Sequence, residues 1–511
     1  MPAFRQAGTG NLNDNPGMAI FYNSGNLIEF SEDEESMVIK FKLDNKEINY
    51  NFATAWEKEK DGIKNIDEFR KCLETMTVML NNTLLLKLLW TGILYIIIRN
   101  MKRLENYIIC VLSIFFVLSC SFSQNNDVAE SQKSETTIMP ESLPWSQKMA
   151  ETLMADYEKL WQIEDTANPH WTYTHGLVSL AYLKLWKNTN DTRYYKYAES
   201  YVDSLIDEKG TIKGYDLQRY NIDKINSGKI LFIFYKETGD TRYKVAMDTL
   251  RKQLKDQPRT ESGGFWHKNR YPHQMWLDGI YMGAPFYAQY GLEFNEPAIF
   301  DDIINQILLI EEKTRDEKTG LLYHAWDESK QQKWSDPVTG CSPHFWGRAM
   351  GWFAMALVDV LDYIPEEHPR RSEIIAVLQR LAEAIVKVQE EETGLWYQVL
   401  DQGKREGNYI EGSVSSMFTY TLLKAVKKGY IDKSYLENAF IAYEGIIKHL
   451  MKSDAGGKVT ITPVCAVAGL GSNPYRDGSY EYYVNEMKRD NDPKATGPFI
   501  MASILYDEMK K

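Results

Sequence analysis

The stretch KNTNDTRY at residues 187–194 returns as KETGDTRY at residues 236–243. Each copy forms a turn and then places an Asp-Thr pair where a helix would start, so that a side-chain oxygen can cap the first free amides. The echo therefore indicates a recurring helical unit. Around it, the 3.6-residue period predicts twelve helices, or six consecutive pairs, near residues 145–162, 174–188, 192–207, 223–237, 241–255, 278–291, 297–315, 346–364, 370–391, 411–428, 432–452 and 496–509.

Short glycine-aromatic segments lie between the helix pairs. TGLLYHAWD at 319–327 is echoed by TGLWYQVLD at 393–401 and, more loosely, by GGFWH at 263–267. Their alternation is strand-like. Six helical hairpins stacked in a ring predict an all-α fold, an (α/α)6 barrel with short strand-like loops at its mouth. A helical solenoid is the competing arrangement.

The composition narrows the functional classes. The 511 residues are 44% hydrophobic, which is enough for one large core with attachments. With 59 basic and 71 acidic residues, the net charge of −12 argues against nucleic-acid binding. The 13 Trp, 32 Tyr and 20 Phe suit sugar rings but also build ordinary cores. None of the five cysteines forms a CxxC pair, and we expect Cys341 and Cys465 to be buried free thiols rather than a disulfide.

An export signal lies inside the chain. MKRLENYIICVLSIFFVLSC, from Met101, has a basic start, a short apolar run and a final LSC that resembles a bacterial lipobox, which would make Cys120 the lipidated residue. We therefore expect residues 101–124 to be a lipoprotein-type signal peptide, 125–144 a linker and 145–511 the barrel. The protein would be exported, either periplasmic or anchored to a membrane through this lipid. Residues 1–100 are expected to be a start-site artefact or a fusion, with a genuine N-terminal segment as the alternative.

Polar residues stand at the starts of alternate helices. If these helices line the inside, their N-termini share one mouth, which would gather Thr174-His175, Asp223, Asp278, Arg348 and Glu411-Gly-Ser413. Helix N-termini favour anions, so this mouth suits a carboxylate-bearing ligand. Burial among indoles would raise the pKa of Asp278 whereas a helix N-terminus would lower it, so the net direction stays open. Plain N-caps for both aspartates and a structural ion pair for Arg348 are the alternatives.

Other catalytic motifs are absent from the sequence. It has no GxSxG elbow, no HExxH pair and no EF-hand loop, and Gly469-Leu-Gly471 lacks the third glycine of a dinucleotide site. Nothing in the sequence requires a metal or a cofactor.

Three longer motifs resemble one enzyme family. WLDGIYMGAPFYA (276–288), HFWGRAMGWFAMALVDVL (344–361) and AGLGSNPYRDGSYEYY (468–483) are similar to the unsaturated rhamnogalacturonyl hydrolases of glycoside hydrolase family 105, related to family 88. The resemblance covers about residues 145–509. It implies an (α/α)6 barrel and a pectin-derived oligosaccharide substrate, left by a polysaccharide lyase, that ends in a 4,5-unsaturated uronic acid.

The resemblance also implies the site residues. Asp278 would be the general acid/base and Asp223 its acidic companion. The implied substrate-binding residues are Arg348 and Lys268, which would hold polar and carboxylate groups, and the pocket wall of His267, His324, Trp276, Trp346, Trp352 and Tyr173. Asp278 would protonate C4 of the enol ether, water would add to C5, and the hemiketal would open and release the aglycone.

Two alternatives remain. The substrate could be an unsaturated glucuronyl fragment of ulvan or a glycosaminoglycan, with the loops holding Arg405, Tyr409 and Arg476 deciding the next subsite. Alternatively, the chain could be a surface lipoprotein that binds glycans without turnover.

Overall fold

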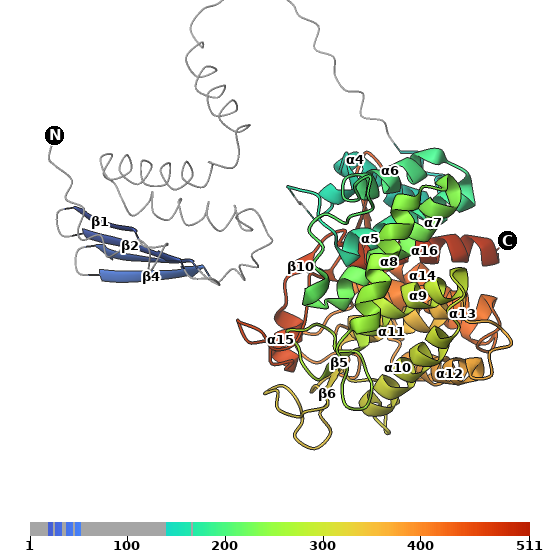
Figure 1. Cartoon of the computed structure of the whole chain (residues 1–511). Coiled ribbons are helices and arrows are strands. Elements are labelled where there is room, and N and C mark those ends of the chain that lie inside the picture. The colour runs from blue at the N-terminus through green and yellow to red at the C-terminus, as the bar shows by residue number, and fades with distance from the viewer. Residues whose placement is uncertain are drawn as a thin grey trace, which may run out of the picture. The chain divides into compact units, whose positions relative to one another are not determined.

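The computed structural model describes residues 19–23, 26–32, 37–43, 46–52, 139–164 and 167–510, in two compact units that divide at Thr136. In the first unit, β1 (Ala19–Asn23), β2 (Asn26–Glu32), β3 (Met37–Leu43) and β4 (Lys46–Phe52) form an antiparallel meander in that order (Figure 1). These strands lie within residues 1–100, for which the sequence predicted no fold. The predicted signal peptide with Cys120 and most of the predicted linker lie outside the described residues.

The second unit contains the predicted helices. Within residues 139–164 and 167–510 they are α4 (Trp145–Asp156), α5 (Tyr173–Thr189), α6 (Thr192–Asp203), α7 (Lys229–Thr238), α8 (Thr241–Asp256), α9 (Leu277–Glu293), α10 (Ala298–Thr314), α11 (Gly347–Val360), α12 (Arg371–Lys387), α13 (Gly412–Lys427), α14 (Tyr435–Gly445) and α16 (Pro493–Lys510). A further short helix, α15 (Tyr480–Asn485), lies in a loop where none was predicted. In this described part, no helix combines the length and apolarity of a membrane span.

Six of these helices form an inner ring. α5, α7 with its preceding 3₁₀ helix η4 (Ile222–Gly228), α9, α11, α13 and α16 pack side by side in that order, and α16 closes onto α5. The outer helices α6, α8, α10, α12 and α14 each pack on the inner helix that precedes them, and α4 packs on α16 (Figure 1). The (α/α)6 barrel is confirmed. A solenoid is excluded, because its first and last repeats would not touch.

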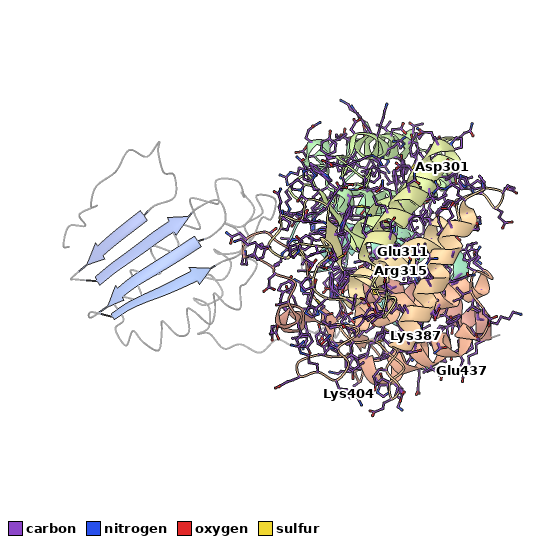
Figure 2. All side chains as sticks on the ribbon, turned by 90° about the horizontal axis from the view of Figure 1, so that it is seen from below. Asp301, Glu311, Arg315, Lys387, Lys404 and Glu437 are labelled. Carbon is purple, nitrogen blue, oxygen red and sulfur yellow. The ribbon has the colours of Figure 1, made fainter. Side chains whose placement is uncertain are left out.

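Burial differs between the two rings. Every residue of α11 is buried, whereas outer helices expose charged side chains such as Asp301 on α10, Lys387 on α12 and Glu437 on α14 (Figure 2). The repeated Asp-Thr-Arg turns start outer helices, as Asp191 and Asp240 cap α6 and α8 by accepting hydrogen bonds from backbone amides. The repeat thus marks two of the passages from the inner ring to the outer one, from α5 to α6 and from α7 to α8.

Short strands connect the helices. β5 (Gln274–Trp276) pairs with β6 (Ala325–Asp327), β7 (Met451–Ser453) with β8 (Val459–Ile461), and β9 (Val464–Cys465) with β10 (Lys488–Arg489). β6 lies in the predicted glycine-aromatic segment 319–327. The predicted helix at 223–237 begins instead as η4, and the one at 432–452 ends in the π-helical turn η5 (Ile446–Leu450) and β7. Cys341 and Cys465 are buried free thiols, as expected.

A buried lysine inside the ring has no hydrogen-bond partner. The Nζ atom of Lys229 on α7 lies 3.6 Å from the ring centroid of Tyr281 on α9, and neither Nζ nor the Tyr281 hydroxyl makes a hydrogen bond to another described residue. Burial lowers the pKa of Lys229 to about 7, although the nearby Asp359 opposes this shift. The ammonium form of Lys229 is therefore unfavourable in the folded protein.

Replacing Lys229 should change how stability depends on pH. The unfolded chain keeps this lysine charged up to its ordinary pKa of 10.5, whereas the folded chain releases the proton near pH 7. Stability should therefore rise with pH between these two values. Lys229→Met should raise the free energy of unfolding at pH 6 and flatten this rise, as measured by urea unfolding at pH 6, 8 and 9.5. The exposed Lys387→Met is the matched control, and an unchanged pH dependence in Lys229→Met would contradict the assignment.

Candidate active site

Asp223 is held as an anion by two neighbours. It lies in the first turn of η4, with Oδ2 2.6 Å from Nζ of Lys268 and Oδ1 3.1 Å from Nε2 of His267. Burial alone would raise the pKa of this carboxyl, but the charges and hydrogen bonds of Lys268 and His267 reverse the effect and hold its pKa well below the usual range. Its side chain remains 15% exposed, so the carboxylate is accessible to a ligand.

Asp278 has a different environment. It lies in the first turn of α9, and its Oδ2 is 3.3 Å from Nε2 of His324, whose side chain is fully buried. The carboxyl side chain is 14% exposed, although Oδ2 itself is buried without a hydrogen-bond partner. Asp278 thus faces an imidazole and, unlike Asp223, makes no ion pair with a lysine or arginine among the described residues.

Backbone pairing brings the two carboxylates into one site. The β5–β6 pair aligns Trp276 with Ala325, and the amide of Leu277 donates to the carbonyl of His324 at 3.1 Å. The amide of Ile222 donates to the carbonyl of His267 at 3.1 Å, which ties η4 to the same loop. The elements that carry both acids are therefore fixed by main-chain hydrogen bonds.

Aromatic contacts complete the connection between the acids. The ring of Trp276 stacks on His267 at 4.6 Å between centroids and meets His324 edge-on at 5.3 Å. Gly279, next to Asp278, approaches so closely that a Cβ at this position would lie 3.0 Å from Nδ1 of His267. A continuous path of contacts thus runs from Asp223 through His267, Trp276 and His324 to Asp278.

Arg348 lies at the start of α11 and is 1% exposed. Its guanidinium donates to Ser413 Oγ at 2.8 Å, to the Ala466 carbonyl at 3.2 Å, to Glu411 Oε1 at 3.3 Å and to the Cys465 carbonyl. Glu411 is fully buried and also accepts from the amides of Val414 and Cys465. Arg348 therefore forms a structural ion pair with Glu411, which was the alternative to a role in substrate binding. Contact of Arg348 with a substrate remains a prediction.

The aromatic residues predicted to form the pocket wall do not all lie beside the acids. Trp346, 1% exposed, lies 4.8 Å from the ring of His324 and donates to Gln398 at 3.2 Å. Trp352, one turn into α11, is buried, stacks on Tyr281 at 4.9 Å and meets Tyr173 edge-on at 6.2 Å. Trp346 thus lies beside the acid pair, whereas Trp352 belongs to the packed interior.

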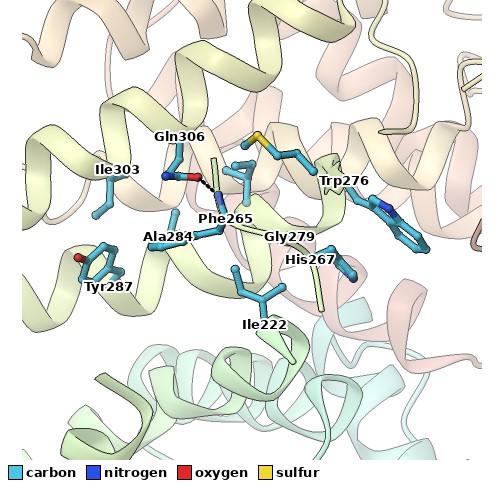
Figure 3. A pocket seen from close by; sticks show the side chains of 11 residues that line it. Ile222, Phe265, His267, Trp276, Gly279, Ala284, Tyr287, Ile303 and Gln306 are labelled. Atoms are coloured by element: carbon cyan, nitrogen blue, oxygen red, sulfur yellow. Dashed lines mark hydrogen bonds between the residues drawn. The ribbon is translucent and has the colours of Figure 1, made fainter. Parts of the chain in front are cut away.

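An enclosed pocket lies behind the stacked rings of His267 and Trp276. Its other lining residues are mostly apolar: Ile222, Phe265, Met275, Gly279, Ile280, Ala284, Tyr287, Ile303 and Gln306 (Figure 3). Gln306 accepts a hydrogen bond from the amide of Phe265 at 2.7 Å, which holds the loop of His267 in place. Neither Asp223 nor Asp278 lines this pocket, and its apolar wall does not suit an acidic sugar.

Two further residues touch this cluster and were not among the predicted site residues. Tyr271 stacks on Trp276 at 4.9 Å, and its hydroxyl accepts a hydrogen bond from Arg476 at 2.9 Å. Tyr483 on α15 contacts Nδ1 of His324 at 2.8 Å. Tyr483 ends the motif at 468–483, which was the available signal, but the sequence could not show which side chain it meets.

The arrangement supports acid-base chemistry. One carboxylate is fixed as an anion by a lysine and an imidazole, and the second, on the neighbouring inner helix, contacts a single imidazole. Two acids in unequal environments can divide the roles of charge stabilisation and proton transfer.

Breaking the Arg348–Glu411 pair should destabilise the fold. Arg348→Met leaves the Glu411 carboxylate buried without its cation, which should cost about 3 kcal/mol or more. Adding Glu411→Gln should recover part of this loss, because it removes the uncompensated charge. Urea unfolding measures both effects. Arg405→Met breaks the exposed pair with Glu481, 45% and 69% exposed, and should change stability by less than about 1 kcal/mol. Equal losses at both arginines would contradict the assignment.

Comparison with known proteins places the barrel in a family. Residues 145–510 match the family model described as Glycosyl Hydrolase Family 88. A solved glycoside hydrolase from family 105 of C. acetobutylicum ATCC 824 is 46% identical, with a TM-score of 0.69, and the match covers 72% of this chain and 100% of that one. Residues 3–85 match a separate model described as a domain of unknown function, DUF4861.

Two curated relatives match parts of the barrel. Protein Atu3128 of Agrobacterium fabrum is 37% identical over 227 residues, which is 43% of this chain and 96% of that protein. The unsaturated rhamnogalacturonyl hydrolase YesR of Bacillus subtilis is 27% identical over 272 residues, or 52% of this chain and 74% of that protein. The chain therefore belongs to the related glycoside hydrolase families 88 and 105.

Proposed function

We propose that the enzyme releases a 4,5-unsaturated uronic acid from the non-reducing end of lyase-generated oligosaccharides of the rhamnogalacturonan type. The observation that carries this proposal is the pair of partly exposed acids, Asp223 and Asp278, joined by His267, Trp276 and His324 at the starts of two neighbouring inner elements. The relative named as an unsaturated rhamnogalacturonyl hydrolase supports the same substrate class.

The reaction is a hydration that leads to hydrolysis. Asp278 donates a proton to C4 of the C4–C5 double bond, and the positive charge develops at C5, where the ring oxygen shares it. The Asp278 carboxylate then takes a proton from water as the water oxygen bonds to C5. The resulting hemiketal at C5 opens to a ketone, which breaks the ring and leaves a hemiacetal at C1. That hemiacetal collapses to an aldehyde and releases the aglycone as an alcohol. Asp223 stays ionised throughout and stabilises the positive charge.

Lys268 is assigned to the carboxylate and hydroxyl groups of the sugar. Arg348 is assigned to the same groups by resemblance only, because it is 1% exposed and already bonded to Glu411. Lys268 is 16% exposed beside Asp223, so its ammonium can contact a ligand while it keeps its ion pair. Trp276 and Trp346, 6% and 1% exposed, lie beside the acids and are the rings assigned to the wall of the sugar site.

Asp278→Asn should abolish turnover of an unsaturated rhamnogalacturonan disaccharide. Asparagine cannot donate the proton, so kcat should fall by at least about a hundredfold. Loss of the ultraviolet absorbance of the conjugated double bond measures turnover. Asp301→Asn makes the same change in the first turn of the outer helix α10, at an exposed position, and should leave the rate unchanged. Substantial activity in Asp278→Asn would exclude this residue as the acid.

The same assay separates the alternatives. Unsaturated disaccharides from rhamnogalacturonan, ulvan and glycosaminoglycan digests, offered in parallel, should show the highest kcat/KM for the first. Preference for an ulvan or glycosaminoglycan disaccharide would show that the enzyme is an unsaturated glucuronyl hydrolase. Binding of all three without loss of absorbance would support a glycan-binding lipoprotein.

We also propose that the protein is exported and lipidated at Cys120, on the basis of the basic, apolar and LSC segments of residues 101–120. In a bacterial host, the full chain should incorporate labelled palmitate and sediment with membranes, and Cys120→Ser should do neither. Cys110→Ser, which alters a cysteine of the same segment outside the LSC motif, is the control. Equal membrane association of wild type and Cys120→Ser would overturn the proposal.

A further inference from the structure

Tyr483 is fixed in one position beside the predicted acid. Its side chain is fully buried on α15, and its ring stacks on Trp346 at 5.8 Å with 17° between the planes. The backbone carbonyl of Tyr483 accepts from Gln398 Nε2 at 3.0 Å. The hydroxyl lies 2.8 Å from Nδ1 of His324, which is also fully buried. The phenol therefore meets the imidazole with little freedom to turn away.

The hydroxyl of Tyr483 has to be the donor in this contact. Burial raises the pKa of Tyr483 well above its ordinary value, and the charges of Tyr482 and Asp278 add to this effect, so the phenol keeps its proton. Within the described residues, the hydroxyl makes its hydrogen bond to His324 Nδ1. If Nδ1 carried a proton and donated instead, the buried phenolic O–H would have no acceptor, at a cost of about 1–3 kcal/mol.

The other ring nitrogen faces the acid. With Nδ1 as an acceptor, the proton of neutral His324 resides on Nε2. That nitrogen lies 3.3 Å from Asp278 Oδ2, and both atoms are buried and make no hydrogen bond of ordinary geometry within the described residues. Such contacts are often long in a ligand-free site and shorten when substrate binds. An Nε2–H at this position would hold Oδ2 and leave Oδ1 as the oxygen that serves the substrate.

We propose that Tyr483 is a positioning residue that keeps His324 in its Nε2–H tautomer, and that His324 in turn orients the Asp278 carboxyl for proton transfer. The inference rests on the function proposed above. It adds a group that acts through an imidazole and does not itself touch the substrate.

The second imidazole of the site shows what this phenol adds. Nε2 of His267 contacts Asp223 at 3.1 Å, but its Nδ1 is buried without a hydrogen-bond partner. Lys268, at 2.6 Å, holds Asp223 instead. A cation suits a carboxylate that stays charged. A neutral N–H fixes orientation without demanding a permanent negative charge, which suits a carboxyl that must gain and lose a proton.

The tautomer can be tested without any substrate. The protein has eight histidines, and ¹⁵N-histidine labelling with long-range ¹H–¹⁵N spectra distinguishes the two tautomers. The signal that disappears in His324→Gln identifies His324. We expect Nε2–H in the wild type and a mixture, or the other tautomer, in Tyr483→Phe. An Nδ1–H tautomer in the wild type, or an unchanged tautomer in Tyr483→Phe, would overturn the inference.

Kinetic measurements test whether the Tyr483 hydroxyl contributes to turnover. Tyr483→Phe keeps the ring and its stack on Trp346, so the melting temperature should change little. Without the donor, kcat on the unsaturated disaccharide should fall about tenfold or more while KM stays within about twofold. Tyr480→Phe is the matched control, because its hydroxyl lies on the same short helix but bonds the carbonyls of Arg405 and Glu406.

The outcomes separate the two proposals. An active wild type with an equally active Tyr483→Phe would reject the positioning role and leave the proposed function intact. A wild type that turns over none of the unsaturated disaccharides would reject the proposed function, and the catalytic part of the inference with it. In that case the histidine spectra would still decide whether Tyr483 sets the tautomer.

Discussion

Burial of the inner helices on all sides is the constraint on which the barrel depends. A helix in this position has no solvent face, so each ionisable side chain must find a partner within the ring or lie at its open rim. α11 has such a pair near each of its ends. Arg348 at its start is neutralised by Glu411, and Asp359 near its end accepts from Lys424 at 2.6 Å. Lys229 lacks such a partner, and its lowered pKa is the consequence.

The same constraint distinguishes the two acids at the rim. Asp223 and Asp278 each begin an inner element and each retain some exposure, yet one has a lysine within 2.6 Å and the other contacts an imidazole. The difference comes from loops, because Lys268 and His324 both lie outside the helices. The ring thus sets where the acids stand, while the connecting segments determine how each one is held.

The twelve helices could be predicted because the period of apolar residues and the capping aspartates are local signals. Asp191 and Asp240 cap the helices that the repeat indicated. The 3₁₀ start at Asp223 could not be predicted, because an apolar period does not separate a tight helix from an α-helix. The strands of residues 19–52 alternate visibly, as in MVIKFKL, so their period of two was a local signal for this part of the fold as well.

The site residues that the family resemblance implied lie close together in the structure. The residues that hydrogen-bond to them could not be predicted from the sequence. Arg348 meets Glu411 across 63 residues of chain, and His324 meets Tyr483 across 159. No periodicity encodes contacts of this range. They depend on how the loops cross the mouth of the ring, which is a property of the closed barrel as a whole.

The stretch from β9 to β10 provides several of these long-range contacts. The carbonyls of Cys465 and Ala466 accept from Arg348, and Tyr483 from the same stretch contacts His324. A segment that comes late in the chain therefore secures two side chains supplied much earlier, by α11 and by the residue before β6. The helix α16 follows this stretch directly and closes the ring against α5. The groups that hold Arg348 and His324 therefore come from the last stretch of chain before the ring closes.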